Sequence, residues 1–144
     1  MFELKIERLS EISSVEPLAA AAQAEGFNFL DRLIDEWQNG TNRFEKPGEV
    51  IYGAFIDAQL IATGGLTLQR EGLGRVRRVY VHPDYRRRGI AKSLMNQVLG
   101  FAKLHYPVVV LYTETTEARQ MYELLGFVSE SPDGPDHATH RLIF

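Results

Sequence analysis

The chain has 144 residues, of which 44% are hydrophobic and 24% charged, and its formal net charge is −3. This length and composition predict one globular domain over residues 1–144, with a core of ordinary size. The absence of cysteine excludes a disulfide scaffold, a Cys-ligated metal and a Cys nucleophile, and it fits a cytoplasmic protein. Residues 1–10 lack the apolar region of a signal peptide, and no apolar run is long enough to span a bilayer, so no membrane partner is expected.

The first third of the chain predicts a strand followed by two helices. Polar and apolar side chains alternate over residues 2–9, as in a strand with one solvated face. Apolar residues then recur at helical spacing from Val15 toward Gly26, with Ser10 or Ser13 as the expected N-cap. A second helix is expected over residues 29–38.

The middle of the chain predicts three antiparallel strands and a central parallel one. Apolar runs at 49–56 and 60–68 are separated by a short loop and form a hairpin, followed by a strand over 75–81. Gly64-Gly65 predicts a bulge or the close approach of another backbone. Residues 107–112 are apolar on both faces and are reached through a helix, which predicts a buried strand parallel to 75–81.

The last third predicts a capped helix and two strands. Thr115 or Thr116 caps the helix, which ends at Gly126, and strands follow over 127–129 and 138–144. The complete pattern predicts a mixed α/β fold. Its central sheet is mostly antiparallel with one parallel junction, and helices cover both faces.

The segment between the 75–81 strand and the next helix has the properties of a phosphate site. Pro83 ends the strand, and helical periodicity begins after Gly89. The first N–H groups of a helix have no partner within it and carry partial positive charge, so an anion binds well there. Gly89 and Ala91 are small enough for a phosphate to approach the backbone. The basic side chains of the segment are Arg86, Arg87, Arg88 and Lys92. The alternative is a basic helix cap that binds nothing.

Charge is distributed unevenly along the chain. Residues 75–92 hold seven basic side chains and one acid, a balance of +6, so the remainder sums to −9. A basic island in an acidic protein suits a compact polyanionic ligand better than a long nucleic-acid track. A nucleic-acid-binding module is therefore the weaker alternative, and no nucleic-acid partner is expected.

Two motifs resemble those of the GCN5-related N-acetyltransferase (GNAT) family. Val81-x-Pro83-x-x-Arg86-x-x-Gly89-x-Ala91 is similar to the acetyl-CoA-binding motif that follows the family's fourth strand. Tyr122-x-x-x-Gly126-Phe127, which starts 33 residues after Gly89, is similar to a later family signature. Two motifs in the right order are more specific than either alone. The resemblance covers residues 50–144 and implies the GNAT fold, with acetyl-CoA as co-substrate.

The resemblance implies an acetyl-CoA-dependent N-acetyltransferase that passes the acetyl group directly to a primary amine of a small molecule or peptide. The backbone of Tyr80 and Val81 would bind the pantetheine arm, and the Val81 N–H would stabilise the oxyanion. Tyr122 would protonate the departing thiolate, and the alternative is a core tyrosine. The cofactor-binding residues implied are Tyr80, Val81, Arg86, Arg87, Arg88, Gly89, Ile90, Ala91, Lys92 and Thr115.

The acceptor side is less defined. In the family the first helices overhang the acceptor pocket, which makes Phe29 and Trp37 candidate substrate residues. Thr115 stands where the family often has an asparagine that contacts the cofactor, so its hydroxyl would contact the cofactor or only cap the helix. A homodimer is a further expectation of the resemblance.

One position departs from the family pattern. Arg75 stands where many members carry a glutamate base, so Glu71, Glu114 or a bound water would have to replace it. This departure keeps a catalytically silent CoA-binding or regulatory domain as an alternative function. An Arg75 that faced the pocket would favour an anionic acceptor, but we expect Arg75 and Arg77 to face solvent.

No metal site is expected. His137 and His140 precede and enter the last predicted strand, without acidic or Cys partners at a convincing spacing. We therefore expect both histidines at the surface.

Overall fold

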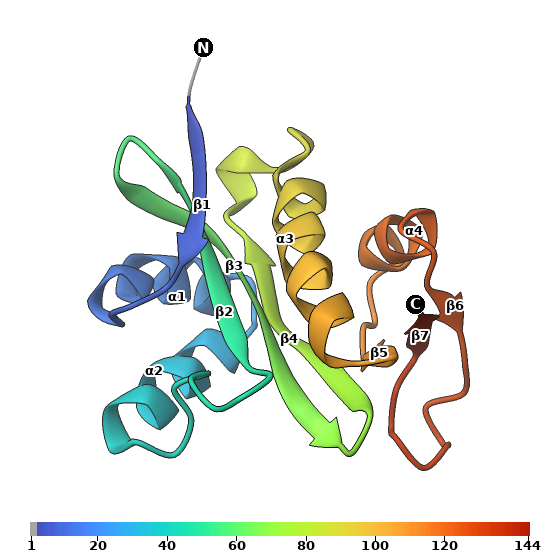
Figure 1. The fold of residues 1–144 in the computed structure, drawn as a ribbon. Coiled ribbons are helices and arrows are strands. Elements are labelled where there is room, and N and C mark those ends of the chain that lie inside the picture. The colour runs from blue at the N-terminus through green and yellow to red at the C-terminus, as the bar shows by residue number, and fades with distance from the viewer. Residues whose placement is uncertain (1–2) are drawn as a thin grey trace.

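The computed structural model describes residues 3–144, and over these residues the chain forms a seven-stranded mixed sheet with helices on both faces (Figure 1). The strands are β1 (Leu4–Arg8), β2 (Val50–Ile56), β3 (Gln59–Arg70), β4 (Leu73–Val81), β5 (Val108–Leu111), β6 (Val128–Ser129) and β7 (His140–Ile143). The helices are α1 (Glu16–Ala24), α2 (Phe29–Asn39), α3 (Ile90–His105) and α4 (Thr116–Leu124), with 3-10 turns η1 (Ser13–Val15) and η2 (Pro83–Tyr85). Phe2, which the prediction placed in the first strand, lies outside the described residues.

The sheet has the order β1-β2-β3-β4-β5-β7-β6. All neighbours are antiparallel except β4 and β5, which are parallel because α3 carries the chain across the sheet between them. This confirms the predicted mixed sheet with one parallel junction. The parallel pairing is short, since it joins residues 73–75 only to residues 108–110. Beyond Arg75, β4 therefore has no strand partner on its β5 side.

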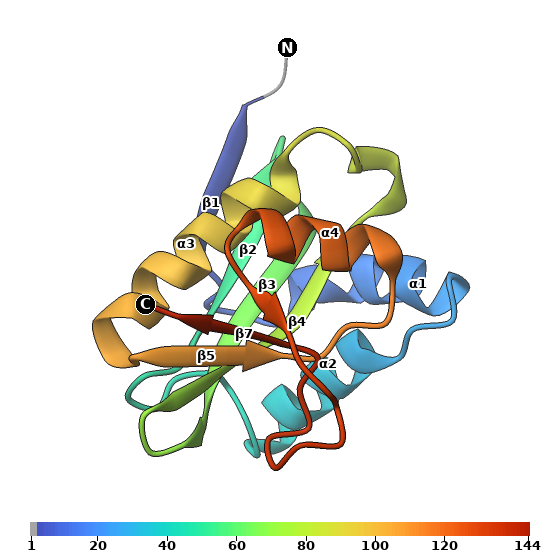
Figure 2. The same ribbon diagram turned by 90° about the vertical axis from the view of Figure 1, so that its right-hand side faces the viewer.

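Two helix pairs cover the two faces of the sheet (Figures 1 and 2). On one face α1 and α2 bury Leu18, Leu30 and Leu33 together with residues of β2 and β3. On the other face α3 and α4 bury Met95, Val98 and Tyr122 against the middle of the sheet. The core is thus split into two apolar layers with the sheet between them, as predicted from the periodicity of the segments.

A bulge interrupts β4 opposite the predicted glycine pair. Thr63 pairs with Tyr80 but Gly65 pairs with Arg77, so β4 has one extra residue here. Arg78 takes φ 58°, a left-handed backbone that is uncommon outside glycine, and its carbonyl accepts a 2.7 Å hydrogen bond from the buried Thr63 hydroxyl. The bulge is as expected. Side chains also approach the glycines: a Cβ on Gly64 would lie 3.3 Å from Leu94 of α3, and one on Gly65 would lie 2.8 Å from Phe44 and 3.3 Å from the Arg77 carbonyl of β4.

The helix caps agree with the prediction at one helix and not at another. Thr115 caps α4 by accepting the Ala118 N–H at 3.3 Å, and Gly126 lies beyond the helix end with φ 102°. In contrast, Val15 stands at the N-cap of α1, which has no side-chain cap. The predicted cap Ser13 lies instead in η1, where Glu11 accepts its N–H at 2.7 Å.

The expectation that Arg75 faces solvent is wrong. Its side chain is 8% exposed and donates to Gln69 Oε1 at 2.9 Å, to the His137 carbonyl at 3.1 Å and to the Asp136 carbonyl. The cause is that the segment before β7 folds back over β4, which sequence periodicity does not reveal. Arg75 therefore fastens that segment to the sheet.

The same segment buries two other polar groups. Asp136 is 4% exposed and accepts hydrogen bonds from Arg70 at 3.0 and 3.2 Å and from Arg141 at 2.7 Å. These two arginines lower the pKa of Asp136 to about 2 from its usual 3.8. His140 is fully buried, with Nε2 2.8 Å from Glu123 and Nδ1 2.9 Å from Thr139, so the expectation of a surface histidine is wrong.

We predict that Asp136→Asn lowers the free energy of unfolding at pH 7 by about 2 kcal/mol, because Arg70 and Arg141 lose a buried charged partner. A carboxylate whose pKa is lowered on folding stabilises the fold above its unfolded pKa, and this stabilisation is lost as pH falls through its folded pKa. The gap between wild type and variant should therefore shrink from pH 4 toward pH 2. Urea unfolding across this range measures the gap.

Asp133→Asn in the same segment is the matched control, since Asp133 is exposed. It should match wild type at every pH. A gap for Asp136→Asn that did not change between pH 7 and pH 2 would contradict the charge-based account.

Candidate functional site

The free side of β4 exposes backbone polar groups near the strand end. The His82 N–H donates to the Ile61 carbonyl at 2.8 Å, which makes Ala62 and Val81 a non-hydrogen-bonded pair in the ladder. The N–H and C=O of Val81 therefore point away from β3, toward the side where β5 has separated. By the same alternation the backbone of Tyr80 is paired with Thr63 of β3. This differs from the expectation that the Tyr80 backbone is available to a ligand.

The chain then passes through η2 into the N-terminus of α3, which no side chain caps. In Figure 1 this loop leads from the upper end of β4 into α3. Gly89 stands at the N-cap with φ 76°, and the first turn of α3 has no acidic residue. The first intrahelical bond runs from the Ser93 N–H to the Gly89 carbonyl, so the preceding N–H groups of α3 have no partner in the helix. Space is open in front of Gly89, because a Cβ built there would meet no atom within 4 Å.

Arg86, the first residue of the predicted phosphate motif, is tied to α1. Its terminal nitrogens donate to Glu25 at 2.8 and 2.6 Å, and its Nε donates to the Val81 carbonyl at 3.0 Å. The Tyr80 hydroxyl also donates to Glu25. Hydrogen bonds from Arg86 and Tyr80 lower the pKa of Glu25, whereas burial and the Glu25 charge raise the pKa of Tyr80. Arg86 thus holds the loop against both β4 and α1.

The other basic residues of the loop remain at the surface. Arg87 has φ 64° and lies 3.7 Å from Glu117 of α4, with both side chains highly exposed. The Arg88 guanidinium lies 5.3 Å from the centre of the Tyr85 ring. Lys92 is exposed on the first turn of α3. Arg87 and Gly89 both have left-handed backbone, and such residues are typical of loops whose backbone N–H groups bind an anion.

Tyr122 lies on the inner face of α4. It is 4% exposed and packs edge-to-face on Phe127 at 5.5 Å between ring centres. Burial raises the pKa of Tyr122, so its hydroxyl keeps its proton at neutral pH. Within residues 3–144 this hydroxyl has no hydrogen-bond partner, unlike that of Tyr106, which donates to the Gly48 carbonyl at 2.8 Å.

The candidate acceptor residues lie on the opposite face of the sheet. Phe29 forms an aromatic group with Phe27 and Tyr80, at 5.7 and 6.0 Å between ring centres. Trp37 of α2 packs against the same α1/α2 core and is partly buried. The structure therefore brings Phe29 into contact with Tyr80 at the end of β4.

The two candidate bases lie at different ends of the site. Glu71 is in the turn between β3 and β4, and the length of β4, about 25 Å, separates it from Val81. Glu114 follows β5 and accepts the Tyr112 hydroxyl at 2.9 Å. Glu71 is thus too distant from Val81 to act with it, and Glu114 is the better placed of the two.

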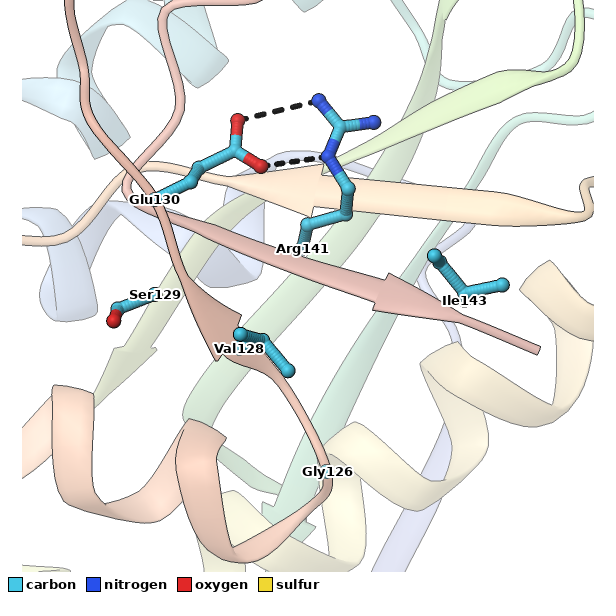
Figure 3. A pocket seen from close by; sticks show the side chains of 6 residues that line it. All are labelled: Gly126, Val128, Ser129, Glu130, Arg141 and Ile143. Carbon is cyan, nitrogen blue, oxygen red and sulfur yellow. Dashed lines mark hydrogen bonds and ion pairs between the residues drawn. The ribbon is translucent and has the colours of Figure 1, made fainter.

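A hollow of 320 Å³ lies elsewhere, at the outer edge of the sheet (Figure 3). It is lined by Gly126, Val128, Ser129, Glu130, Arg141 and Ile143. Glu130 accepts from Arg141 at 2.6 and 3.2 Å, so the charges in this hollow are paired. β5 and β7 separate this edge from β4. The hollow is therefore distinct from the Val81 and α3 region.

Comparison with known proteins agrees with this geometry. The model of the acetyltransferase (GNAT) family matches residues 7–127. The chain belongs to the GNAT family. Its fold is the GNAT fold, as the sequence predicted.

Solved GNAT-fold structures cover almost the whole chain. A protein of this fold from Exiguobacterium sp. 255-15 is 30% identical, and the match covers 98% of this chain and 93% of that protein with a TM-score of 0.85. The PaiA N-acetyltransferase from Thermoplasma acidophilum, solved in complex with coenzyme A, is 20% identical and covers 99% of both chains with a TM-score of 0.73. At 20% identity, the similarity to the second structure establishes the fold alone.

Two curated relatives are longer proteins named N-acetylaspartate synthetase. The one from Xenopus tropicalis is 33% identical over 87 residues, and the one from Rattus norvegicus is 34% identical over 85. These matches cover 58% and 56% of this GNAT chain, but only 32% and 28% of the relatives. The chain thus spans about a third of the length of the curated relatives it matches.

Two further findings concern the described residues 3–144. None of their helices is long and apolar enough to cross a membrane. No group of three or more His, Cys, Asp or Glu side chains among them could hold a metal ion.

Sequence reasoning missed Glu25, the residue that ties the end of α1 to the loop between β4 and α3. One signal was present, because Glu25 stands at the C-cap of α1, where the helix dipole disfavours an acid. An acid in such a position is often held by a basic partner from elsewhere in the chain. The periodicity of the sequence does not identify that partner.

We predict that Glu25→Ala speeds amide hydrogen exchange in residues 82–89 about tenfold, because Arg86 loses its charged partner. Glu117→Ala is the matched control. It removes an exposed contact with Arg87 and should change exchange little. Equal protection of the loop in wild type and Glu25→Ala would show that Glu25 does not hold it.

Proposed function

We propose that the protein is an acetyl-CoA-dependent N-acetyltransferase that transfers the acetyl group directly to an amine. One observation carries the proposal: the free edge of β4 leads into the uncapped, basic N-terminus of α3. A backbone edge binds an extended amide-containing chain, and a helix N-terminus binds phosphate, so together they suit the two ends of coenzyme A. The family match and the coenzyme A complex of a fold neighbour support this assignment.

The residues present fit this cofactor, whose contribution when bound is an acetyl group activated as a thioester. Gly89, Ile90, Ala91 and Lys92 would hold the pyrophosphate with their backbone N–H groups, and Gly89 leaves room for it. Arg87, Arg88 and Lys92 would add charge. Arg86 would act indirectly, by fixing the loop through Glu25. Thr115 would serve mainly as the α4 cap.

Two groups of the chain would take part in the chemistry. The Val81 N–H would donate to the carbonyl oxygen where negative charge develops, a contribution of about 3 kcal/mol to lowering the barrier. The Tyr122 hydroxyl would hold the proton that the leaving thiolate receives. The chain has no cysteine, so a cysteinyl intermediate is impossible, and transfer would be direct. The relatives' name points to an amino acid as the amine.

We predict that Gly89→Glu abolishes binding of acetyl-CoA in calorimetric titration, because a carboxylate would occupy the anion position at the α3 N-terminus. Gly89→Ala is the first control, since it imposes the same backbone strain at φ 76° while its Cβ enters open space. Gly100→Glu is the second, since it adds the same charge to an open position farther along α3.

Both controls should bind acetyl-CoA within roughly a few-fold of wild type. Absence of binding by wild type at ordinary salt would overturn the proposed function. Binding without release of CoA for any amine would favour the catalytically silent domain instead.

We predict that Tyr122→Phe lowers kcat roughly a hundredfold with little change in acetyl-CoA affinity, because it removes a general acid and keeps the ring packing. Tyr106→Phe is the matched control. Tyr106 is another buried tyrosine of the same core, but its hydroxyl donates to the Gly48 carbonyl, so its loss should affect stability and not kcat. A Tyr122→Phe enzyme with wild-type kcat would assign Tyr122 to the core alone.

A further inference from the structure

Two arginines of β4, Arg77 and Arg78, face the α1/α2 side of the sheet next to the free edge. Arg77 contacts Thr67 of β3, and Arg78 reaches Glu36 of α2. Arg78 lies in the bulge with φ 58°, a left-handed conformation that is strained outside glycine. The bulge directs the two consecutive side chains to the same side, whereas a regular strand would direct one of them to the α3 side.

The hydrogen-bonding capacity of these guanidinium groups is mostly unused. Arg77 donates from Nε to Thr67 at 2.9 Å, and its terminal nitrogens have no partner within residues 3–144. Arg78 donates from Nη2 to Glu36 at 3.2 Å, while its Nε is buried without any partner. Buried polar groups in folded proteins nearly always find partners, so an orphaned donor of this kind calls for an explanation.

The charges are also poorly balanced. Burial lowers the pKa of Arg77, and the neighbouring positive charges of Arg78 and Arg75 lower it further, although the charges of Glu36 and Glu49 partly oppose this. Within residues 3–144, Glu36 is the carboxylate paired with Arg78, and Arg77 forms no ion pair. In contrast, Arg70, Arg86 and Arg141 each pair with an acid at 3.0 Å or less. A half-buried excess of positive charge is stabilised by a bound anion.

We propose that Arg77 and Arg78 bind a carboxylate of the acceptor, so that the acceptor is an amino acid or a related amine that carries a carboxylate. This inference rests on the proposed acetyl transfer. Guanidinium groups are suited to it because they hold a carboxylate through two parallel N–H donors.

The position of the pair agrees with this role. Arg78 precedes Val81 by three residues on the same strand, and Tyr80 and Phe29 lie on the same face. In an amino acid only the α-carbon separates the amine from its carboxylate. A carboxylate held by these arginines would therefore keep the amine close to the end of β4, where the Val81 N–H is free.

Arg75 takes no part in this site. Its guanidinium is occupied by Gln69 and by the carbonyls of Asp136 and His137. Glu36, however, competes with the acceptor for Arg78, since its carboxylate occupies one Arg78 nitrogen. Substitution of Arg78 and substitution of Glu36 should therefore change the acceptor KM in opposite directions.

The first experiment compares acceptors by the release of CoA, detected with a thiol-reactive dye. The protein gives no background in this assay because it has no cysteine. Aspartate and glutamate are compared with the same amino acids whose carboxylates are amidated, and with phosphoethanolamine. We expect kcat/KM for the carboxylates to exceed that for the amides and for phosphoethanolamine by roughly tenfold or more.

The second experiment uses variants with the preferred acceptor. Arg77→Gln and Arg78→Gln should each raise the acceptor KM roughly tenfold, with the Kd of acetyl-CoA unchanged. Glu36→Gln should lower the acceptor KM, because it frees Arg78. Arg32→Gln, which removes an exposed arginine of α2, is the control and should leave both constants unchanged.

The outcomes separate the two proposals. If amidated and free amino acids were acetylated equally well, or if Glu36→Gln raised the acceptor KM as the arginine variants do, the carboxylate site would be overturned while acetyl transfer stood. Acetylation of phosphoethanolamine in preference to the carboxylates would also overturn it. Absence of acetyl-CoA binding would overturn the proposed function, and the carboxylate site with it.

Discussion

β4 and β5 run parallel over residues 73–75 and 108–110 and then separate, and the rest of the site depends on this separation. Parallel strands connected through a helix must cross the sheet, so α3 begins at the end of β4 that β5 has left. The free N–H of Val81 and the free N–H groups of α3 are consequences of the same topology. A longer parallel pairing would give the Val81 N–H a partner in β5 and would remove the free edge of β4.

The separation has a structural cost that other contacts offset. β5 has β7 as its other neighbour, and the segment before β7 is fastened to β4 by Arg75 and to β3 by the Arg70–Asp136 pair. These contacts hold β5 and β7 to the rest of the sheet although the strands themselves share only a short ladder. At the opposite side of the divergence, Glu25 and Arg86 join α1 to the loop after β4. The free edge of β4 thus lies between two sets of charged contacts, one that involves Arg70, Arg75 and Asp136 and one that involves Glu25 and Arg86.

The sequence predicted most of the fold, because its elements are set by local signals. Hydrophobic period, Pro83, Gly89 and the Thr115 cap each act within a few residues, and the strands and helices that they define agree with the structure. Apart from the missed cap of α1, the errors concern pairs distant along the chain. Arg75, which contacts residues more than sixty positions away, and His140 looked like surface residues because neither burial nor partner is encoded in the local pattern.

The site was predictable to the extent that it consists of backbone. Val81 and the α3 N-terminus follow from strand and helix ends, which periodicity locates well. For Tyr80 the prediction located the strand end but not the direction of the backbone groups. Which of two neighbouring residues faces the free edge depends on the register with β3. The bulge at Arg78 was expected near the glycine pair, but its effect on the direction of Arg77 and Arg78 required the three-dimensional arrangement.

The count of +6 over residues 75–92 treats their basic side chains as one island, but the fold divides them. Arg75 is committed to the segment before β7, Arg86 is neutralised by Glu25, and Arg77 and Arg78 face the α1/α2 side away from the loop at the α3 N-terminus. A continuous basic track, such as nucleic acid requires, is therefore not formed by these side chains. What the division leaves is two separate basic positions at the end of β4, one in the loop before α3 and one at the bulge. Two anionic ligand groups on either side of one reacting centre match this arrangement better than a single extended polyanion does.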